Sequence, residues 1–201
     1  MTVRIGTSGW NYPEWRGGFY PDGLVHRDEL RYLASQLNSV ELNGSFYSLQ
    51  RPSSYRSWFV QTPDDFVFAV KGSRYLTHLR RLTGFADGLA NFFASGPLAL
   101  GAKLGPLLWQ FPANLAFDAD TAGAFPRFQE LTADFAYVRL HGGTELYHSD
   151  YPEAELAGWA DRIRSWNRDT YVYFDNTDAG RAPFNALTLA ERLANNHGDH
   201  S

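Results

Sequence analysis

Five short segments of the chain alternate between apolar and polar residues and end in a polar or charged residue just before a turn. They are Val40–Asn43, Phe66–Lys71, Leu107–Pro112, Ala136–His141 and Tyr171–Asp175. Alternation with a period of two is typical of a strand whose two faces meet different surroundings. Because helix-length stretches separate these segments, we expect parallel pairing through helical crossovers. The polar faces should then converge on a shared interior, with a functional site at the carboxyl ends of the strands.

The rest of the chain supplies a sixth strand and the helices between strands. A strand is predicted over 3–8, ahead of a loop over 9–21 that is rich in Gly, Trp, Tyr and Pro. Helices are predicted over about 27–36, 53–61, 84–94, 152–167 and 186–194, with a short one before Glu130. The chain has no internal repeat or linker, so we expect six strand–helix units in a single domain over 1–194 and a frayed tail over 195–201.

Composition narrows the class of protein. The 201 residues are 44% hydrophobic, which is enough for a sizeable core in one domain. A net charge of -4 argues against a broadly basic nucleic-acid-binding surface, although a local basic cleft is compatible with it. The absence of cysteine excludes disulfides and thiolate metal sites. With no charged-then-apolar leader and no run of about 18 apolar residues, we expect a soluble cytoplasmic protein without a membrane partner.

Six longer segments carry a family resemblance. They are IGTSGWNYPEWRGGFYP from residue 5, VELNGSFYSL from 40, FVFAVKGSRYLTH from 66, LGPLLWQFP from 104, YVRLHG from 137 and VYFDNTDAGRAPFNAL from 172. In this order they resemble the domain-of-unknown-function 72, or YecE-like, family, and they cover most of residues 1–117 and 128–193. The resemblance implies an α/β fold of the TIM type, a (β/α) barrel, whose activity is not established.

The central part of the chain departs from this family. The resemblance implies two more strand–helix units between Pro112 and Tyr137, but only about 25 residues separate them, and each crossover needs about a dozen or more. We therefore expect about six of eight units, with the sheet open at this point. The alternatives are a barrel that is open, a partner subunit that fills the gap, and a segment that the sequence lacks. Open edges would favour self-association.

Charged residues dominate the candidate site. Glu41, Lys71, Arg139 and Asp175 are expected inside the barrel. One interpretation is a structural ion-pair network that neutralises buried charge. The other is a catalytic site in which His141 acts with Glu41 or Asp175 as acid and base while the cations bind an anion. His141 lies on the same strand face as Arg139 and precedes two glycines, which places it at a strand terminus.

The loops that follow the strands supply further candidates. The run from Asp175 to Pro183 is dense in carboxylates and amides, which suit either a hard cation, at most one divalent ion, or the caps of turns and helices. Aromatic residues after the first two strands form either a stacking wall for a base or sugar, or a hydrophobic lid. The predicted substrate-binding set is Trp10, Tyr12, Asn43, Tyr47, Lys71, Arg74, Tyr75, His78, Gln110, Arg139, Tyr173 and Asn176.

Two functions from different classes remain open. The first is a hydrolase or lyase that acts on an anionic substrate, either a phosphoester or a sugar-containing compound, at the C-terminal mouth of the barrel. The alternative is a non-catalytic module that holds a nucleotide or single-stranded nucleic acid on aromatic and basic residues. The sequence names neither the substrate nor a cofactor.

Overall fold

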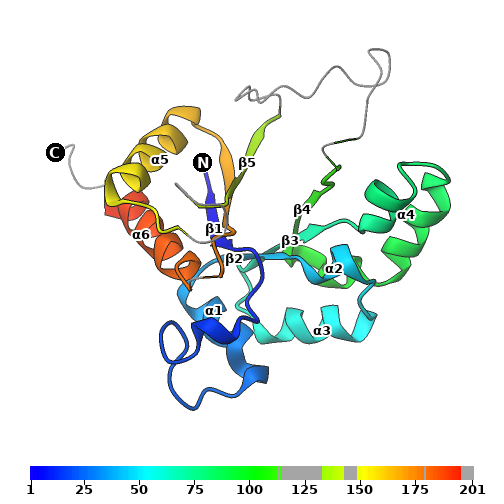
Figure 1. Cartoon of the computed structure of the whole chain (residues 1–201), viewed down its shortest axis with the longest axis horizontal. Coiled ribbons are helices and arrows are strands. Elements are labelled where there is room, and N and C mark those ends of the chain that lie inside the picture. The colour runs from blue at the N-terminus through cyan, green and yellow to red at the C-terminus, as the bar shows by residue number, and fades with distance from the viewer. Residues whose placement is uncertain (113, 115–132, 143–148, 179, 196–201) are drawn as a thin grey trace.

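The fold consists of parallel strands with helices between them (Figure 1). The computed structural model describes residues 1–112, 114, 133–142, 149–178 and 180–195. The strands are β1 (Val3–Thr7), β2 (Ser39–Leu42), β3 (Val67–Lys71), β4 (Leu104–Leu108), β5 (Phe135–Leu140) and β6 (Asp169–Phe174). The α-helices are α1 (Glu29–Gln36), α2 (Gly44–Tyr47), α3 (Pro52–Gln61), α4 (Phe85–Ala94), α5 (Glu153–Trp166) and α6 (Ala182–Asn195). Shorter helical turns are η1 (Pro13–Trp15), η2 (His26–Asp28), the π-helical η3 (Tyr75–Leu79) and η4 (Pro97–Lys103).

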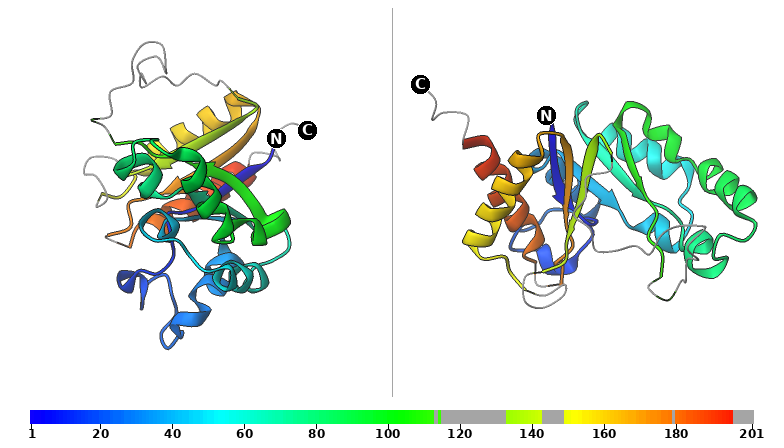
Figure 2. Two further views of the ribbon diagram at one scale, coloured as in Figure 1. Left: turned by 90° about the vertical axis from the view of Figure 1, so that its right-hand side faces the viewer. Right: turned by 90° about the horizontal axis from the view of Figure 1, so that it is seen from above.

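The strands form two three-stranded parallel sheets that meet at one seam. The orders are β5–β6–β1 and β2–β3–β4. At the seam, Ser8 and Glu41 form an isolated parallel bridge, and the Gly9 amide donates to the Glu41 carbonyl at 2.9 Å. The N-terminal strand β1 thus pairs with the last strand β6 and lies beside β2. In the described part of the chain β4 and β5 do not pair, so the prediction of a sheet that is open here is confirmed, and no barrel closes (Figure 2).

A glycine permits the two sheets to meet. A Cβ atom on Gly6 would lie 2.1 Å from the Ser39 carbonyl oxygen, far inside van der Waals contact. Only glycine therefore allows β1 to approach β2 this closely. The close approach positions Ser8 beside Glu41, where the functional site begins.

The two faces of the strands separate as the alternation predicts. The apolar set Val40, Phe68, Val70, Val172 and Phe174 is fully buried in the core under the helices. Burial of each such side chain contributes about 1.5–3 kcal/mol. The opposite faces carry Glu41, Lys71, Arg139 and Tyr173 into the interior between the sheets, and Asp175 follows directly after β6.

Several predicted boundaries are corrected by the structure. The strand predicted over 107–112 is β4, which ends at Leu108. Pro106 has no N–H for a ladder, and β4 tolerates it because it lies at a sheet edge with an irregular register to β3. The last helix begins at Ala182, because Pro183 is compatible with a first turn, and it includes Asn195, which was predicted to belong to the tail. The short helix predicted before Glu130 and residues 196–201 lie outside the described residues.

The loop predicted after β3 is in fact helical. It contains the π-helical turn η3, followed by left-handed backbone at Arg81 and Leu82. The helix α2, directly after β2, was also not predicted from the sequence. Both short elements carry side chains toward the carboxyl ends of β2 and β3. None of the helices in the described part of the chain combines the length and apolar character that crossing a membrane requires.

Candidate functional site

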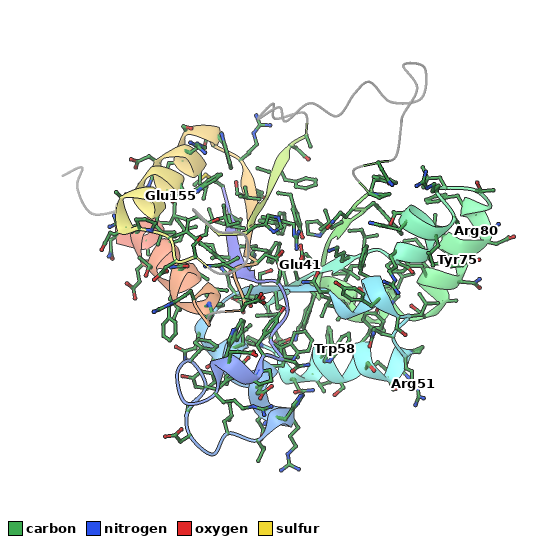
Figure 3. The ribbon with its side chains drawn as sticks, in the orientation of Figure 1. Glu41, Arg51, Trp58, Tyr75, Arg80 and Glu155 are labelled. Atoms are coloured by element: carbon green, nitrogen blue, oxygen red, sulfur yellow. The ribbon has the colours of Figure 1, made fainter. Side chains whose placement is uncertain are left out.

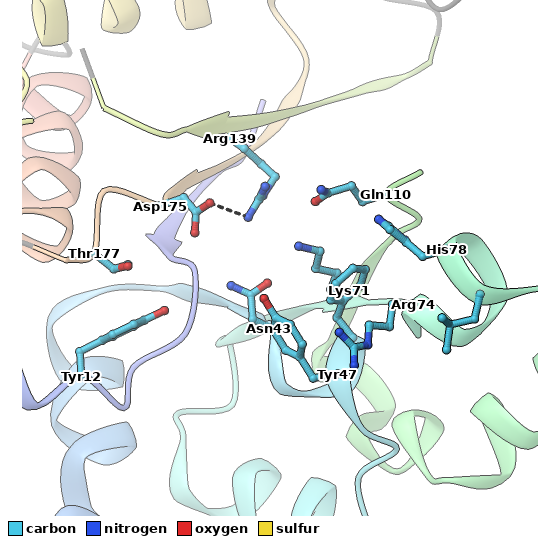
Figure 4. A pocket seen from close by; sticks show the side chains of 12 residues that line it. Tyr12, Asn43, Tyr47, Lys71, Arg74, His78, Gln110, Arg139, Asp175 and Thr177 are labelled. Carbon is cyan, nitrogen blue, oxygen red and sulfur yellow. Dashed lines mark hydrogen bonds and ion pairs between the residues drawn. The ribbon is translucent and has the colours of Figure 1, made fainter. Parts of the chain in front are cut away.

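A cavity of about 540 Å³ opens at the carboxyl ends of the strands (Figure 4). Asn43 follows β2, Lys71 ends β3, Arg139 lies near the end of β5 and Asp175 follows β6. Among the described residues, the lining consists of Tyr12, Asn43, Phe46, Tyr47, Lys71, Arg74, His78, Leu79, Gln110, Arg139, Asp175 and Thr177. Side chains from four strands therefore converge on one space, at the end of the sheet where the sequence places a site.

Below this cavity, Glu41 is the centre of a hydrogen-bond network. Its side chain is 0% exposed. Oε1 accepts from Ser8 Oγ at 2.8 Å, and Oε2 accepts from the Tyr137 hydroxyl at 2.6 Å. Arg139 donates from Nε to both oxygens at 3.2 and 3.1 Å and from Nη2 to Oε1 at 3.0 Å. These donors satisfy both carboxylate oxygens, so the contacts of Glu41 fit the structural ion-pair interpretation.

The same guanidinium group links Asp175 and His141. Arg139 Nη2 donates to Asp175 Oδ2 at 3.0 Å, and His141 Nδ1 lies 2.8 Å from the same oxygen. Arg139 Nη1 lies 3.3 Å from His141 Nε2. Because a guanidinium can only donate, Nε2 accepts from Arg139, and Nδ1 is the ring nitrogen that lies beside Asp175. The two contacts thus distinguish the two ring nitrogens of His141.

These contacts keep Asp175 and Arg139 charged. Burial alone would raise the pKa of Asp175, but the hydrogen bond from His141 and the positive charge of Arg139 lower it below its usual value. Burial alone would lower the pKa of Arg139, but Glu41 and Asp175 raise it. The two groups therefore remain an ion pair across the neutral pH range.

Tyr137 is a site residue that the sequence analysis missed. Burial raises its pKa, and the adjacent Glu41 carboxylate raises it further, so the phenol keeps the proton that it donates. The signal was present in the sequence, because Tyr137 shares the strand face of Arg139 and His141. Tyr173, which was predicted, is fully buried beneath the cavity and hydrogen-bonds Ser39 Oγ at 2.7 Å.

Lys71 is only 7% exposed. Its Nζ lies 4.4 Å from the centre of the Phe46 ring, and within the described residues it makes no hydrogen bond or ion pair. Burial lowers the pKa of Lys71, and Arg139 lowers it further, although Glu41 and Asp175 oppose the shift. Lys71 is therefore a cation that no neighbouring carboxylate contacts directly.

Two further basic side chains line the cavity beside Lys71. Arg74 lies over the Tyr47 ring at 5.5 Å. His78 packs edge-on against Phe46 at 5.2 Å, and its Nδ1 lies 2.8 Å from Thr77 Oγ1. Burial lowers the pKa of His78, and the nearby Lys71 and Arg74 lower it further. At neutral pH this wall of the cavity therefore presents a guanidinium and a largely neutral imidazole.

Most aromatic side chains of the first loop pack in the core. Trp10 packs edge-on against Trp58 at 5.5 Å, and Trp15 is fully buried with Nε1 donating to the Thr177 carbonyl at 3.2 Å. Tyr12 alone of this loop lines the cavity. The contacts therefore fit the hydrophobic lid better than the stacking wall.

The amides after β6 act in local structure. Asn176 is fully buried and donates to the Ser149 carbonyl at 3.0 Å and to Asn185 Oδ1 at 2.8 Å. Such contacts are those of a packed turn. Among the described residues no group of three or more His, Asp or Glu side chains is arranged to hold a metal ion.

The predicted residues thus divide into three sets. Nine of the predicted residues line the cavity, namely Tyr12, Asn43, Tyr47, Lys71, Arg74, His78, Gln110, Arg139 and Asp175. Glu41 and His141 lie behind it and contact Arg139. Trp10, Tyr75, Tyr173 and Asn176 are not part of its lining. Figure 3 shows Tyr75 far from Glu41, and its side chain is half exposed.

Comparisons with known proteins place the chain among uncharacterised relatives. The family model described as "Protein of unknown function DUF72" matches residues 4–131 and 117–200. The UPF0759 protein YecE of Escherichia coli is 27% identical over 127 residues, which is 56% of this chain and 44% of YecE. The UPF0759 protein YunF of Bacillus subtilis is 29% identical over 115 residues, which is 55% of this chain and 40% of YunF. The chain matches less than half the length of these curated relatives.

Solved structures support the same fold. A DUF72 family protein of Thermotoga maritima has a TM-score of 0.83 and 25% sequence identity, with 96% of this chain and 100% of that chain covered. A DUF72 family protein of Enterococcus faecalis has a TM-score of 0.69 at 15% identity, with 96% of each chain covered. At 15% identity, the similarity to the Enterococcus faecalis protein shows a shared fold alone.

Proposed function

Because the chain belongs to the family of proteins of unknown function DUF72, whose name carries no reaction, we propose a function from the geometry of the site. We propose that the cavity binds a phosphoester or a sugar-containing anion and that the protein is a hydrolase or lyase acting on it. One observation supports this most directly. Lys71, Arg74 and Arg139 line one cavity, and among the described residues of its lining Asp175 is the one carboxylate.

Two of these cations supply the attraction for an anion. Arg139 already donates to Glu41, Asp175 and His141. Lys71 and Arg74, in contrast, contact aromatic rings and no carboxylate among the described residues. Their field attracts phosphate locally despite a net charge of -4. The planar guanidinium of Arg74 is suited to two oxygens of one phosphate.

The remaining lining suits a polyhydroxyl group. Asn43 Oδ1 is buried and has no hydrogen-bond partner in the described part of the chain. A buried acceptor without a donor costs about 1–3 kcal/mol, which a hydroxyl group of a ligand would recover. Gln110 presents an amide from another side, and Figure 4 shows both amides facing Lys71. This set fits the hydroxyl groups of a sugar.

Asp175 is a carboxylate of the cavity lining that is positioned to accept a proton. It lines the cavity and stays ionised, while one of its oxygens is held by Arg139 and His141. The other oxygen is turned away from Arg139 (Figure 4). We propose Asp175 as the general base, with His141 and Glu41 as positioning residues, because both act through Arg139 or Asp175.

Titration with inorganic phosphate tests the anion site. In isothermal titration calorimetry we expect wild-type protein to bind phosphate and Arg74→Ala to bind it roughly tenfold more weakly. This loss of about 1.4 kcal/mol is close to the lower end of the range for a hydrogen bond to a charged group, about 1.5–3 kcal/mol. The loss should shrink at high salt. Arg56→Ala is the matched control, because Arg56 is an exposed arginine of α3 outside the cavity. Equal phosphate affinity in both variants, or none in the wild type, would contradict the proposal.

Binding of a nucleotide or single-stranded nucleic acid is the second candidate. It is favoured by Tyr47, which is 65% exposed and carries Arg74 over its ring. Stacking of a base on such a ring contributes about 1–3 kcal/mol. An oligonucleotide that binds wild-type protein and not Tyr47→Ala, while inorganic phosphate binds both equally, would favour this alternative.

We also propose that the open sheet is part of a TIM-type barrel that lacks two strand–helix units. The pairing of the first strand with the last and the single opening between β4 and β5 support this interpretation. The two edges at this opening are sites for self-association, because an unpaired edge presents free N–H and C=O groups.

A further inference from the structure

The two lysines of this chain lie in very different surroundings. The chain contains 18 lysines and arginines, and only Lys71 and Lys103 are lysines. Lys103 is buried, and its ammonium donates to the Phe59 and Thr62 carbonyls at 2.6 and 2.7 Å and to Thr62 Oγ1 at 3.3 Å. All three N–H groups of Lys103 thus have acceptors. Lys71 lines the cavity and has no such acceptor among the described residues.

Lysine at position 71 has a property that arginine lacks. Both side chains can bind an anion, and the chain uses arginine for nearly every other cation. Arginine stays protonated in proteins, whereas lysine can lose its proton and become a nucleophile. Burial and the neighbouring Arg139 disfavour the ammonium form of Lys71. The charges of Glu41 and Asp175 oppose this shift, but neither they nor any other carboxylate among the described residues contacts Nζ. Arg74 and His78 add further basic groups on the same wall.

We propose that Lys71 Nζ is a nucleophile that forms an imine with an aldehyde or ketone substrate bearing a phosphate group. This inference rests on the proposed anion site, which would hold the phosphate. The Nζ lone pair attacks the carbonyl carbon and forms a C–N bond, while the C=O π electrons move to oxygen. The amine gives up one proton and the solvent supplies a second. Both leave with that oxygen as water, so that a protonated C=N bond remains.

The surroundings of Lys71 suit this step. His78 and Lys71 Nζ both pack against the Phe46 ring, and both side chains line the cavity. The neutral imidazole of His78 can exchange protons with the departing oxygen. An iminium ion withdraws electrons from the adjacent carbon and thereby assists cleavage of a neighbouring bond. The inference therefore favours the lyase over the hydrolase within the proposed function.

Trapping with pyridoxal 5′-phosphate, which carries an aldehyde and a phosphate, tests the inference. The full chain is incubated with this probe and then with sodium borohydride, which adds hydride to the imine carbon and leaves a stable secondary amine. Peptide mass spectrometry locates the adduct. We expect roughly tenfold more adduct on Lys71 than on the exposed N-terminal amine of Met1, because phosphate binding holds the aldehyde beside Nζ. Excess inorganic phosphate should lower labelling at Lys71 and not at Met1.

Two controls keep the outcomes distinct. Lys103 should remain unlabelled, because its N–H groups are all used. Lys71→Arg removes the reactive amine, so the adduct at position 71 should be lost while labelling at Met1 stays. Two results would overturn the inference and leave the anion site standing, provided that phosphate binds the wild type. In the first, Lys71 is labelled no more than Met1. In the second, Lys71 is labelled more, but excess phosphate does not lower the labelling.

Pyridoxal, which lacks the phosphate, separates the two proposals. If phosphate fails to bind but pyridoxal labels Lys71 above Met1, the proposed anion site fails and the reactive amine stands. If neither phosphate binds nor pyridoxal labels Lys71, both proposals are overturned.

Discussion

At the scale of single residues, Arg139 organises the site because it contacts both Glu41 and Asp175. It donates to Glu41, Asp175 and Ser8, and it lies within hydrogen-bond distance of His141. A buried ion pair of this kind is costly to disrupt, because removal of one partner leaves an uncompensated charge. Neutral donors to the same carboxylates should therefore also contribute measurably to stability.

Tyr137 is such a neutral donor. Tyr137→Phe removes the hydroxyl that donates to Glu41 Oε2 and leaves a buried oxygen with one donor fewer. We expect the free energy of unfolding to fall by about 1–3 kcal/mol in chemical denaturation. Tyr171→Phe is the control, because Tyr171 lies on β6 and its hydroxyl is not among the donors to Glu41 in the described part of the chain. Equal losses in the two variants would show that the bond to Glu41 contributes nothing specific.

The pKa of Asp175 predicts how stability responds to acid. Because its pKa is lower in the folded than in the unfolded protein, the folded state binds fewer protons below about pH 4. The stabilisation is therefore complete above the usual pKa of an aspartate and is lost as the pH falls through the folded value. Urea denaturation across the acidic range should show a steeper loss in wild type than in Asp175→Asn. Parallel curves would contradict this prediction.

At the scale of elements, the seam between β1 and β2 is the feature most sensitive to substitution. Gly6→Ala would place a Cβ atom 2.1 Å from a backbone oxygen that cannot move away easily. Overpacking of this kind costs about 1–3 kcal/mol. We expect a lowered melting temperature and weaker phosphate binding, because the same seam positions Ser8 beside Glu41.

Gly158→Ala is the matched control for the seam. A Cβ atom at this helical position in α5 meets no atom within 4 Å. Alanine is the better helix former by about 1 kcal/mol, so this variant should be slightly more stable than wild type. A Gly6→Ala variant that is as stable as Gly158→Ala would show that β1 can shift away from β2 without loss.

At the scale of the whole molecule, we propose that copies of the chain associate through the opening between β4 and β5. Unpaired edges associate unless a charge or a covering element prevents it. Phe135, at the start of the edge strand β5, is 39% exposed. We expect sedimentation velocity to show association that increases with protein concentration, and Phe135→Lys to weaken it, because a charge at an edge opposes pairing.

The control for this prediction is a similarly exposed phenylalanine away from the edges. Phe184 on α6 is 43% exposed. Phe184→Lys should leave association unchanged. If both lysine variants reduce association equally, general apolar exposure and not the β5 edge is responsible, and a wild type that remains monomeric at every concentration would contradict edge pairing altogether.

The sequence by itself determined where the strands lie and which face of each turns inward. Period-two alternation is a local property, so residues such as Glu41, Lys71 and Arg139 were assigned to the interior without knowledge of their partners. The opening between β4 and β5 was likewise predictable, because too few residues connect them for two further crossovers. The start of β4 could not be predicted from the sequence, because the edge position that tolerates Pro106 exists only in the assembled sheet.

Only the tertiary structure decided which charges neutralise one another. Glu41 and Arg139 are 98 residues apart in the chain, and Arg139 and Asp175 are 36 apart. Alternation places such groups on one face but does not say which pairs come within hydrogen-bond distance. That depends on how β1 meets β2 at Gly6 and on where each strand ends. The same packing leaves Lys71 without an acidic partner among the described residues and places its ammonium over the ring of Phe46.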